Sequence, residues 1–337
     1  MIQMQMMTEF DYNNEAKNLI CVRKNMAKSP FANKVVIPEP KLELCSKQLL
    51  VMEFLSGKKL ASHIEGNLAS ILDGDVSLAR KVLKAKQEAM FQSSDDTDND
   101  VSVDKRFIRQ VNDILGESNK SLNTTRRGIK ALQLAFMAYD ARKKLSLLLD
   151  VTGHQIFTDG LYNGDPHPGN ILVLDCGRLG LIDYGQTRRL TKKDRLSLAE
   201  VVSSVGKSTQ LENNVGAIAD AMRKCGFRSR NGNDENMSKF AALYFDSDDA
   251  GKKMGYATPQ QYLQHLNSID PMVEVPDSAV FVARTSFLFR GLGALLQQSL
   301  HTSHHWRKYA LQAIETNGYG KPLYNLGLTP PVTFDLE

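Results

Sequence analysis

Apolar residues at helical spacing open the chain. Thr8 can cap a helix here, because Asp11 then occupies the third helical position. The apolar positions that repeat at helical spacing are Phe10, Ala16, Leu19 and Ile20. This pattern predicts a helix over residues 8–27.

Short apolar runs and then a polar stretch follow. Residues 34–37 and 48–54 are rich in β-branched or large apolar side chains and are punctuated by Pro38, Pro40 and Gly57, which predicts two or three short strands. A helical pattern over residues 60–86 then gives way to acidic and small polar residues at 93–100. The latter predict an exposed and dispensable loop, because they offer no apolar surface to bury.

Two further helical patterns lead to the most informative segment. They predict helices over residues 104–115 and 124–157, and the pattern does not decide whether the second helix is broken near Asp140. Residues 163–170 are too rich in Pro and Gly to be helical, and the apolar runs after them flank an Asp-Cys-Gly-Arg turn. We therefore expect a polar loop, then a β-hairpin, then Asp183-Tyr184-Gly185. Helical patterns dominate from there to about residue 316.

Composition is typical of a folded globular protein. Of the 337 residues, 42% are hydrophobic and 24% charged, which suits one large two-lobed domain or two modest ones. The net charge of +4 comes without a long basic stripe, which is weak support for a nucleic-acid binder. The four cysteines are widely spaced, contain no Cys-x-x-Cys pair and indicate neither a disulfide framework nor a zinc site.

The most apolar stretch, residues 279–300, does not read as a membrane span. Arg284 and Arg290 interrupt it, and each would be costly at a bilayer centre. We expect a buried helix instead. The first seven residues have neither a basic region nor an apolar core of signal-peptide length, so no targeting signal is visible.

The polar loop and the residues after the hairpin carry the candidate chemistry. Phosphoryl transfer needs metal ligands that hold nucleotide phosphates and a carboxylate that orients the attacking hydroxyl. Asp165 and Asn170 have the D-x-x-x-x-N spacing of a kinase catalytic loop, and Asp183 begins a D-Y-G similar to the magnesium-binding D-F-G. Each residue alone would be explained by turn formation. Together they predict Asp165 as the base or orienting group, with Asn170 and Asp183 as metal ligands.

Other polar residues near this loop keep more than one interpretation. His167 can position Asp165, contact phosphate or be satisfied by loop carbonyls. A basic group after the D-Y-G can favour an anionic substrate or a membrane surface, but a solvated helix start capped by Thr191 is favoured. Its members are Arg188, Arg189, Lys192, Lys193 and Arg195.

Two motifs resemble the UbiB-like (aarF-domain) atypical kinases. Residues 165–170 (DPHPGN) with 181–185 (LIDYG) resemble that family's catalytic loop and metal motif. Residues 8–16 (TEFDYNNEA) resemble its E-x-D-Y-x-x-E-A segment. The resemblance implies that Glu9 and Asp11 have the family's hallmark role and that Glu15 is the αC-type ion-pair partner. Helix-dipole complementation alone can also explain these acids.

Two further segments resemble the family less specifically. Residues 50–57 are similar to its strand and hinge, which would place Glu53 and Phe54 near adenine, although a plain buried strand explains them nearly as well. Residues 287–293 are similar to a late helical segment. Their role is expected to be packing, because small glycines permit close helix approach.

The resemblance implies a fold and a function. The expected fold is α+β and protein-kinase-like, with a partial small N-lobe at residues 1–59, a mostly helical C-lobe at 60–320 that includes an insertion at about 75–127, and a tail at 321–337. The implied activity is that of an ATP- and Mg²⁺-dependent kinase or ATPase that supports prenylquinone (ubiquinone-type) metabolism in a mitochondrion or plastid. A prenylquinone lipid or membrane surface is a further implied partner, and nucleic acid is not.

The family's upstream elements have no counterpart before Thr8. Members carry a K-x-G-Q motif, an Ala-rich nucleotide loop and a strand lysine that pairs with the αC-type glutamate. We expect either a fragment of an active enzyme, which the complete downstream triad favours, or a catalytically impaired chain that binds nucleotide weakly when alone. A small-molecule kinase of the aminoglycoside or choline type and an inactive pseudokinase scaffold remain alternatives.

Overall fold

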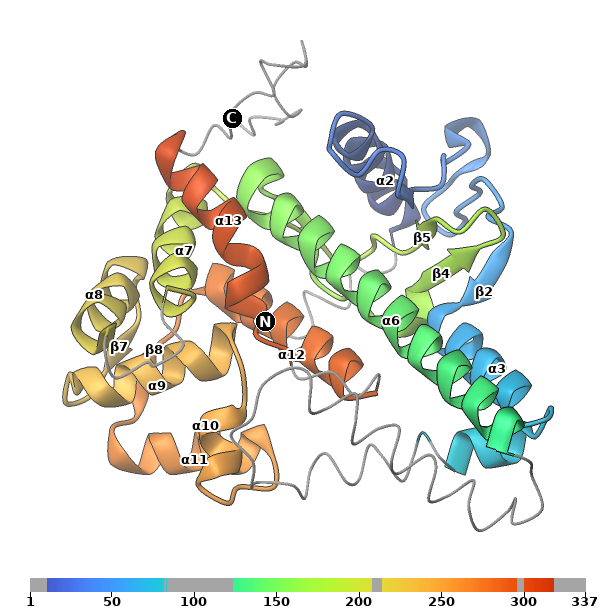
Figure 1. The fold of residues 1–337 in the computed structure, drawn as a ribbon. Coiled ribbons are helices and arrows are strands. Elements are labelled where there is room, and N and C mark those ends of the chain that lie inside the picture. Colours follow the sequence, from blue (N-terminus) through green and yellow to red (C-terminus); the bar gives the residue numbers. More distant parts are fainter. Residues whose placement is uncertain (1–10, 82, 84–123, 208–213, 296–299, 318–337) are drawn as a thin grey trace.

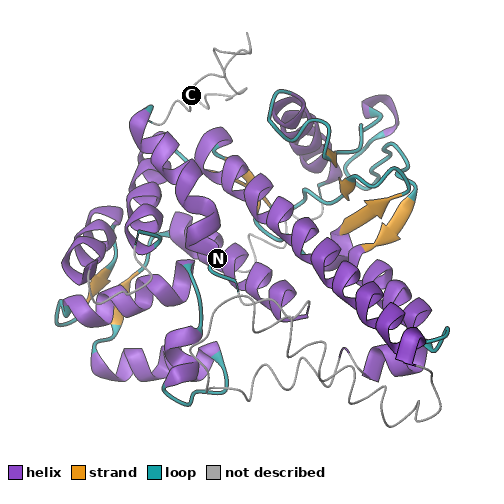
Figure 2. Ribbon diagram, viewed as in Figure 1, coloured by secondary structure: helices purple, strands orange, loops and turns teal. Residues whose placement is uncertain are grey.

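The computed structural model describes residues 11–81, 83, 124–207, 214–295 and 300–317. The predicted loop at 93–100, the predicted helix at 104–115, the tail at 321–337 and Glu9 lie outside these residues. Helices form most of the molecule, and small sheets lie among them (Figure 2). The predicted α+β class is confirmed.

The first described helix begins later than the pattern predicted. α2 covers Tyr12–Ala27, and Asp11 is its N-cap, with a carboxylate that accepts a hydrogen bond from the Asn13 backbone N–H at 3.1 Å. A capped first turn satisfies a backbone donor that has no partner inside the helix. The continuous helix from residue 8 was therefore wrong, whereas its end at Ala27 was right.

A four-stranded sheet lies beside this helix in the order β1-β5-β4-β2 (Figure 1). The predicted hairpin is confirmed as β4 (Ile171–Leu174) and β5 (Leu179–Leu181), which are antiparallel. β1 (Val35–Val36) pairs in parallel with β5, and β2 (Gly57–Lys59) pairs with the other edge of the hairpin. A Cβ at Gly57 would lie 2.5 Å from the Val173 carbonyl oxygen, so only glycine fits there.

The predicted strand at residues 48–54 does not form as a continuous strand, although all of these residues are described. Only isolated bridges join Pro40 to Met52 and Ser46 to Leu49, around the 3₁₀ turn η1 (Leu42–Leu44). The next ladder donors are used by side chains, because the Val51 backbone N–H donates to Cys45 Sγ at 3.4 Å and the Glu39 backbone N–H donates to the Glu53 carboxylate at 3.3 Å, so pairing stays local.

Two predicted helices have different lengths from those expected. α3 (Leu60–Ile71) ends well before residue 86, because Asp73 and Gly74 take positive φ angles of 58° and 89°. α6 (Thr124–His154) runs through Asp140 without a break. The Asp140 carboxylate pairs with Lys144 one turn along instead of competing for the helix backbone. A π-helical turn, η2 (Gln155–Asp159), follows directly.

The helices from residue 192 onward pack on the side of α6 that faces away from the four-stranded sheet (Figure 1). Trp306 is fully buried and donates a hydrogen bond to the Leu149 carbonyl oxygen at 3.0 Å, which fixes the last helix against α6. The remaining elements are β3 (Leu161–Asn163), η3 (Pro168–Asn170), β6 (Thr187–Arg189), α7 (Lys192–Val205), α8 (Val215–Cys225), β7 (Arg228–Ser229), α9 (Asp234–Phe245), α10 (Asp249–Lys253), α11 (Pro259–Ile269), β8 (Met272–Glu274), α12 (Asp277–Leu295) and α13 (Thr302–Glu315).

The apolar stretch near the end forms α12, which carries the buried Arg290. Gly291 faces open space among the described residues, so the expected close helix approach is not made there. No described helix is both long and apolar enough to cross a membrane.

Candidate functional site

The polar loop starts where β3 ends against β6. The Gly164 backbone N–H donates to the Gln186 carbonyl oxygen at 3.0 Å, and a Cβ at Gly164 would lie 2.9 Å from that same oxygen. Only glycine permits this close pairing of the two segments. As a result, Asp165 leaves the strand at a fixed point next to the segment that follows Asp183.

One amide joins the loop to the D-Y-G segment. Asn163 accepts a hydrogen bond from the Asp165 backbone N–H at 2.8 Å through Oδ1 and donates to the Asp183 carbonyl oxygen at 2.7 Å through Nδ2. Asn163 was not among the predicted site residues. Its place immediately before the Gly-Asp pair, at the end of a strand, was the available signal.

Asn170 and Asp183, the two predicted metal ligands, are in direct contact. Asn170 Nδ2 donates to Asp183 Oδ2 at 2.8 Å, and the Ile182 backbone N–H donates to the Asn170 carbonyl oxygen at 3.1 Å. The second oxygen, Asp183 Oδ1, accepts from the Gly185 backbone N–H at 3.0 Å. The β4–β5 hairpin connects the two residues, so its rigid register sets their separation.

Tyr184 anchors the D-Y-G segment in the core. Its side chain is buried, and its hydroxyl accepts a hydrogen bond from Gln155 Nε2 at 3.1 Å. Burial raises the pKa of this hydroxyl, so it stays protonated at neutral pH. The backbone immediately after Asp183 is therefore held by the π-helical turn that carries Gln155.

Glu15 reaches the same segment from α2. Its Oε1 accepts a hydrogen bond from the Tyr184 backbone N–H at 3.3 Å. Burial raises the pKa of Glu15, and the nearby Asp183 carboxylate raises it further. The structure thus brings Glu15, the predicted ion-pair residue, close to Asp183, the predicted metal ligand, so that two acidic side chains face each other.

The carboxylate of Asp165 has a cationic partner that sequence reasoning missed. Arg284 of α12 lies with Nη2 3.2 Å from Asp165 Oδ2, and its Nη1 donates to Gln186 Oε1 at 3.2 Å. Both charged side chains are partly exposed. In the sequence Arg284 was only a charge in an apolar stretch, 119 positions from Asp165, and no spacing rule links such distant residues.

His167 serves its own loop. Its Nδ1 accepts a hydrogen bond from the Gly169 backbone N–H at 3.1 Å, and it caps the 3₁₀ turn η3. Its own backbone N–H donates to the Asp165 carbonyl oxygen at 2.7 Å. Of the interpretations left open, this geometry supports a local structural role.

The remaining predicted residues lie at other places. Asp11 caps α2, one turn before Glu15. The Glu53 carboxylate pairs with Arg23 at 3.2 Å and accepts from the Glu39 backbone N–H at 3.3 Å. The side chain of Phe54 is 89% exposed. Proximity of these last two to a bound adenine stays a prediction.

Much of the basic group after the D-Y-G is used for packing. The Arg188 guanidinium lies 3.8 Å from the Phe281 ring centroid, and Arg195 Nη1 donates to the Thr158 carbonyl oxygen at 2.6 Å. Thr191 caps α7 as predicted, accepting from the Asp194 backbone N–H at 3.1 Å.

These contacts assemble one acidic centre from four segments of the chain. Mg²⁺ prefers carboxylate, carbonyl and phosphate oxygens, and it keeps several ligands from water or nucleotide. The Asp183 carboxylate and the Asn170 side-chain oxygen can supply two protein ligands, with Asp165 close by for a nucleophile. The donor set suits a magnesium-bound phosphate group.

Comparison with known proteins gives a consistent result. A family model described as the ABC1 atypical kinase-like domain matches residues 1–94 and 126–212. An uncharacterized Synechocystis protein, slr0889, is 27% identical over 199 residues, which cover 58% of this chain. The Arabidopsis thaliana chloroplastic protein ACTIVITY OF BC1 COMPLEX KINASE 1 is 29% identical over 76 residues, or 23% of this chain. The chain spans 33% and 10% of these two relatives, respectively.

A solved structure is also similar to this chain. It is described as the complex of Rv3197 with erythromycin from Mycobacterium tuberculosis. The match covers 91% of this chain and 58% of the solved one, with 16% sequence identity and a TM-score of 0.43.

Proposed function

Because this chain belongs to the ABC1 atypical kinase-like family, we propose that it binds Mg²⁺ and ATP at Asp165, Asn170 and Asp183 and transfers or hydrolyses the terminal phosphoryl group. Asp183 is the principal metal ligand in this proposal, and Asn170 is the second. Asp165 orients the attacking hydroxyl or water.

The observation that carries the proposal is the hydrogen-bonded link between the loop and the D-Y-G segment. The Asn170–Asp183 contact of 2.8 Å brings both metal-ligand candidates to one point. The Asn163 amide holds the backbones at Asp165 and Asp183 together. Positioning and electrostatic stabilisation dominate phosphoryl-transfer catalysis, so a rigid ligand set is the feature that this reaction requires most.

The electrostatics of the acidic centre around Asp183 also favour a bound cation. The pKa of Glu15 is raised by burial and by the facing Asp183, which means that the two acids repel each other without a counter-charge. Arg284 is engaged with Asp165 on the side of α12. A magnesium ion bound to Asp183 would offset the repulsion, and its chemistry there would be neutralisation of the phosphate charge.

Physiological context forms the outer part of the proposal. The Arabidopsis relative is named ACTIVITY OF BC1 COMPLEX KINASE 1, chloroplastic. We extend the resemblance to a role in supporting prenylquinone metabolism in a plastid or mitochondrion, at a membrane surface that supplies the prenylquinone lipid.

Nucleotide titration tests the central claim. The purified chain should bind a fluorescent ATP analogue in Mg²⁺ and lose most of that binding in EDTA. Asn170→Ala should weaken the Mg²⁺-dependent part of the affinity by at least about tenfold, because a metal ligand is lost. Asn267→Ala on α11 is the matched control and should bind like the parent, because the Asn267 amide donates to the Leu263 carbonyl oxygen and accepts from the Met272 backbone N–H, and neither partner belongs to the site.

Two results would contradict the proposal. One is nucleotide binding by the parent chain that is equal in Mg²⁺ and EDTA. The other is equal Mg²⁺-dependent affinity in the parent and in Asn170→Ala when circular dichroism shows both to be folded.

A further inference from the structure

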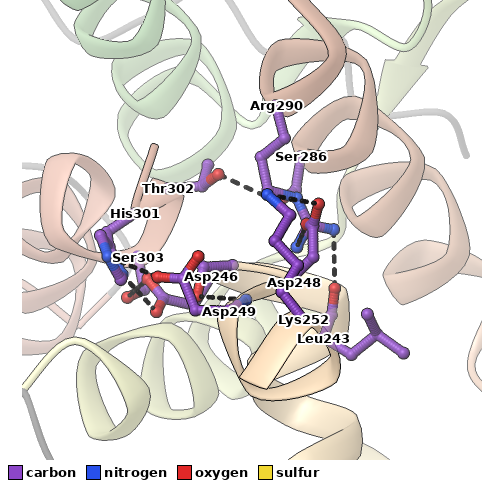
Figure 3. Close-up of polar contacts among 11 residues, drawn as sticks. Leu243, Asp246, Asp248, Asp249, Lys252, Ser286, Arg290, His301, Thr302 and Ser303 are labelled. Carbon is purple, nitrogen blue, oxygen red and sulfur yellow. Dashed lines mark hydrogen bonds and ion pairs between the residues drawn. The ribbon is translucent and has the colours of Figure 1, made fainter. Parts of the chain in front are cut away.

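A second group of metal-ligating side chains lies away from the nucleotide site. Three of the seven histidines fall within residues 301–305, at the start of α13. His301 is the N-cap of that helix, and His304 follows in its first turn. His301 contacts Asp246, which is the C-cap of α9 (Figure 3), and His304 lies near both side chains. None of these residues contacts Asp165, Asn170 or Asp183 through a hydrogen bond or ion pair within the described chain.

The three side chains converge on a small volume. Asp246 Oδ2 lies 2.9 Å from His301 Nδ1, and one ligand atom from each of Asp246, His301 and His304 falls within 4.8 Å of the others. The two imidazole rings are stacked, with centroids 5.0 Å apart and an interplanar angle of 21°. Ligands of a tetrahedral zinc ion are about 3.3 Å apart, given bonds of about 2.0 Å. A rotation of the exposed His304 would close the remaining gap.

Neighbouring groups already hold two of these side chains in orientation. Ser303 Oγ donates to Asp246 Oδ1, which leaves Oδ2 directed at His301 (Figure 3). Asp249 Oδ2 lies 3.2 Å from His301 Nε2, on the opposite side of the ring from Asp246. Metal-ligating histidines commonly donate their second ring N–H to a carboxylate in this way, which fixes the tautomer and strengthens the ligand.

The backbone of the cluster is also tied together. The Thr302 backbone N–H donates to the Asp246 carbonyl oxygen at 3.2 Å, so the end of α9 and the start of α13 are joined directly. The nearby Asp248 is engaged by the buried Arg290 at 2.8 Å, which takes it out of the ligand set. The available donors are therefore one carboxylate oxygen and two imidazoles.

We propose that Asp246, His301 and His304 bind a divalent transition-metal ion of the Zn²⁺ class, with Asp249 and Ser303 orienting the ligands. Two imidazoles and a carboxylate suit zinc and similar borderline ions better than Mg²⁺ or Ca²⁺, which prefer oxygen. Water would complete the coordination. The ion would fasten α13 to the α9–α10 junction and is separate from the proposed nucleotide chemistry.

The charge balance permits such an ion. The α13 N-terminus disfavours a cation, but two carboxylates flank His301 and offset this effect. Hydrogen bonds to Asp246 and Asp249 raise the pKa of His301 to about 10, so a metal must displace a proton from this ring. Titrations are therefore best made near pH 8, where that competition is weaker than at neutral pH.

Zinc titration of the metal-free chain tests the proposal. The parent should bind one Zn²⁺ in competition with a chromophoric chelator, and Zn²⁺ should raise its melting temperature. His304→Ala should lower the zinc affinity by at least about tenfold, as should Asp249→Asn through loss of the orienting carboxylate. His304 is exposed, so its replacement should leave the metal-free melting temperature unchanged. His265→Ala, on α11, is the matched control for loss of one histidine.

The outcomes separate the site from adventitious binding. Equal zinc affinity in the parent, His304→Ala and His265→Ala would overturn the proposal, as would the absence of stoichiometric binding at about 100 µM Zn²⁺. Substitution with Co²⁺ gives an independent readout, because visible absorption bands of the parent should be lost or shifted in His304→Ala. Unchanged bands would exclude His304 as a ligand.

Discussion

Replacement of Asp183 by asparagine is the most direct probe of the proposed nucleotide site. The change removes one negative charge and keeps the shape of the side chain. A carboxylate oxygen lies about 2.1 Å from a bound Mg²⁺. At that distance the attraction between the charges is about 4 kcal/mol even with the dielectric constant of water. Since 1.4 kcal/mol is a factor of ten, this corresponds to roughly 1,000-fold in affinity. Part of it is offset because the amide is easier to desolvate, so we expect a loss of at least about 100-fold.

The fold should tolerate this substitution. The amide oxygen of the introduced asparagine can still accept the Gly185 N–H, and Asn170 can turn its amide to donate or accept as required. The lost charge-assisted hydrogen bond is worth about 1.5–3 kcal/mol at most. Relief of the repulsion with Glu15 acts in the opposite direction. Circular dichroism and urea unfolding should therefore show a folded variant.

The assay is isothermal titration with ATP at several Mg²⁺ concentrations. Asp175→Asn is the control, since Asp175 lies in the turn of the same hairpin, pairs with Ser56 and gives the same change in net charge. The reasoning is refuted if folded Asp183→Asn binds ATP with the same Mg²⁺ dependence as Asp175→Asn. In that case Asp183 would not be a metal ligand.

Three further outcomes follow from the contacts of single residues. Glu15→Gln should raise the melting temperature at pH 7–8 without nucleotide, and the gain should shrink toward pH 4.5. The reason is that burial and Asp183 raise the pKa of Glu15 in the folded state, so the parent loses stability as the pH rises and Glu15 ionises. A difference in melting temperature that does not change with pH would contradict this repulsion. Asp165→Ala should lower ATP turnover more than ATP affinity, so equal losses in steady-state and titration data would reject its role as the orienting group. Arg290→Met should cost about 3–5 kcal/mol in urea unfolding, because Asp248 loses its buried partner, and Asp248→Asn added to it should recover part of this loss.

Local patterns predicted the hairpin, the D-Y-G segment and the Thr191 cap well. Each depends on neighbours within a few positions, as in the Asp-Cys-Gly-Arg turn, where Gly177 takes a φ of 80°. Family membership confirms the expected kinase-like fold. The lobe and insertion boundaries stay predictions.

The errors occurred where a local signal competed with another of similar strength. Thr8 and Asp11 are both good caps, and the backbone turn at Asp11 decides in favour of the second. Residues 48–54 have strand composition, but the backbone N–H groups of Val51 and Glu39 donate to side chains, so no continuous ladder forms. Contacts between distant segments, such as Arg284 with Asp165 and His301 with Asp246, have no local signature at all.

At Glu15 the family resemblance and the structure give different and complementary information. Resemblance identified it as the partner of a strand lysine, whereas the structure places its carboxylate on the Tyr184 N–H beside Asp183. The α2 face that carries Ala16, Leu19 and Val22 is buried in the core, so the helix position is fixed by packing and not by the charge. The acid is therefore held beside Asp183 whether or not a lysine reaches it. Its raised pKa follows from that placement, and this is why the pH dependence of Glu15→Gln measures the electrostatics of the site directly.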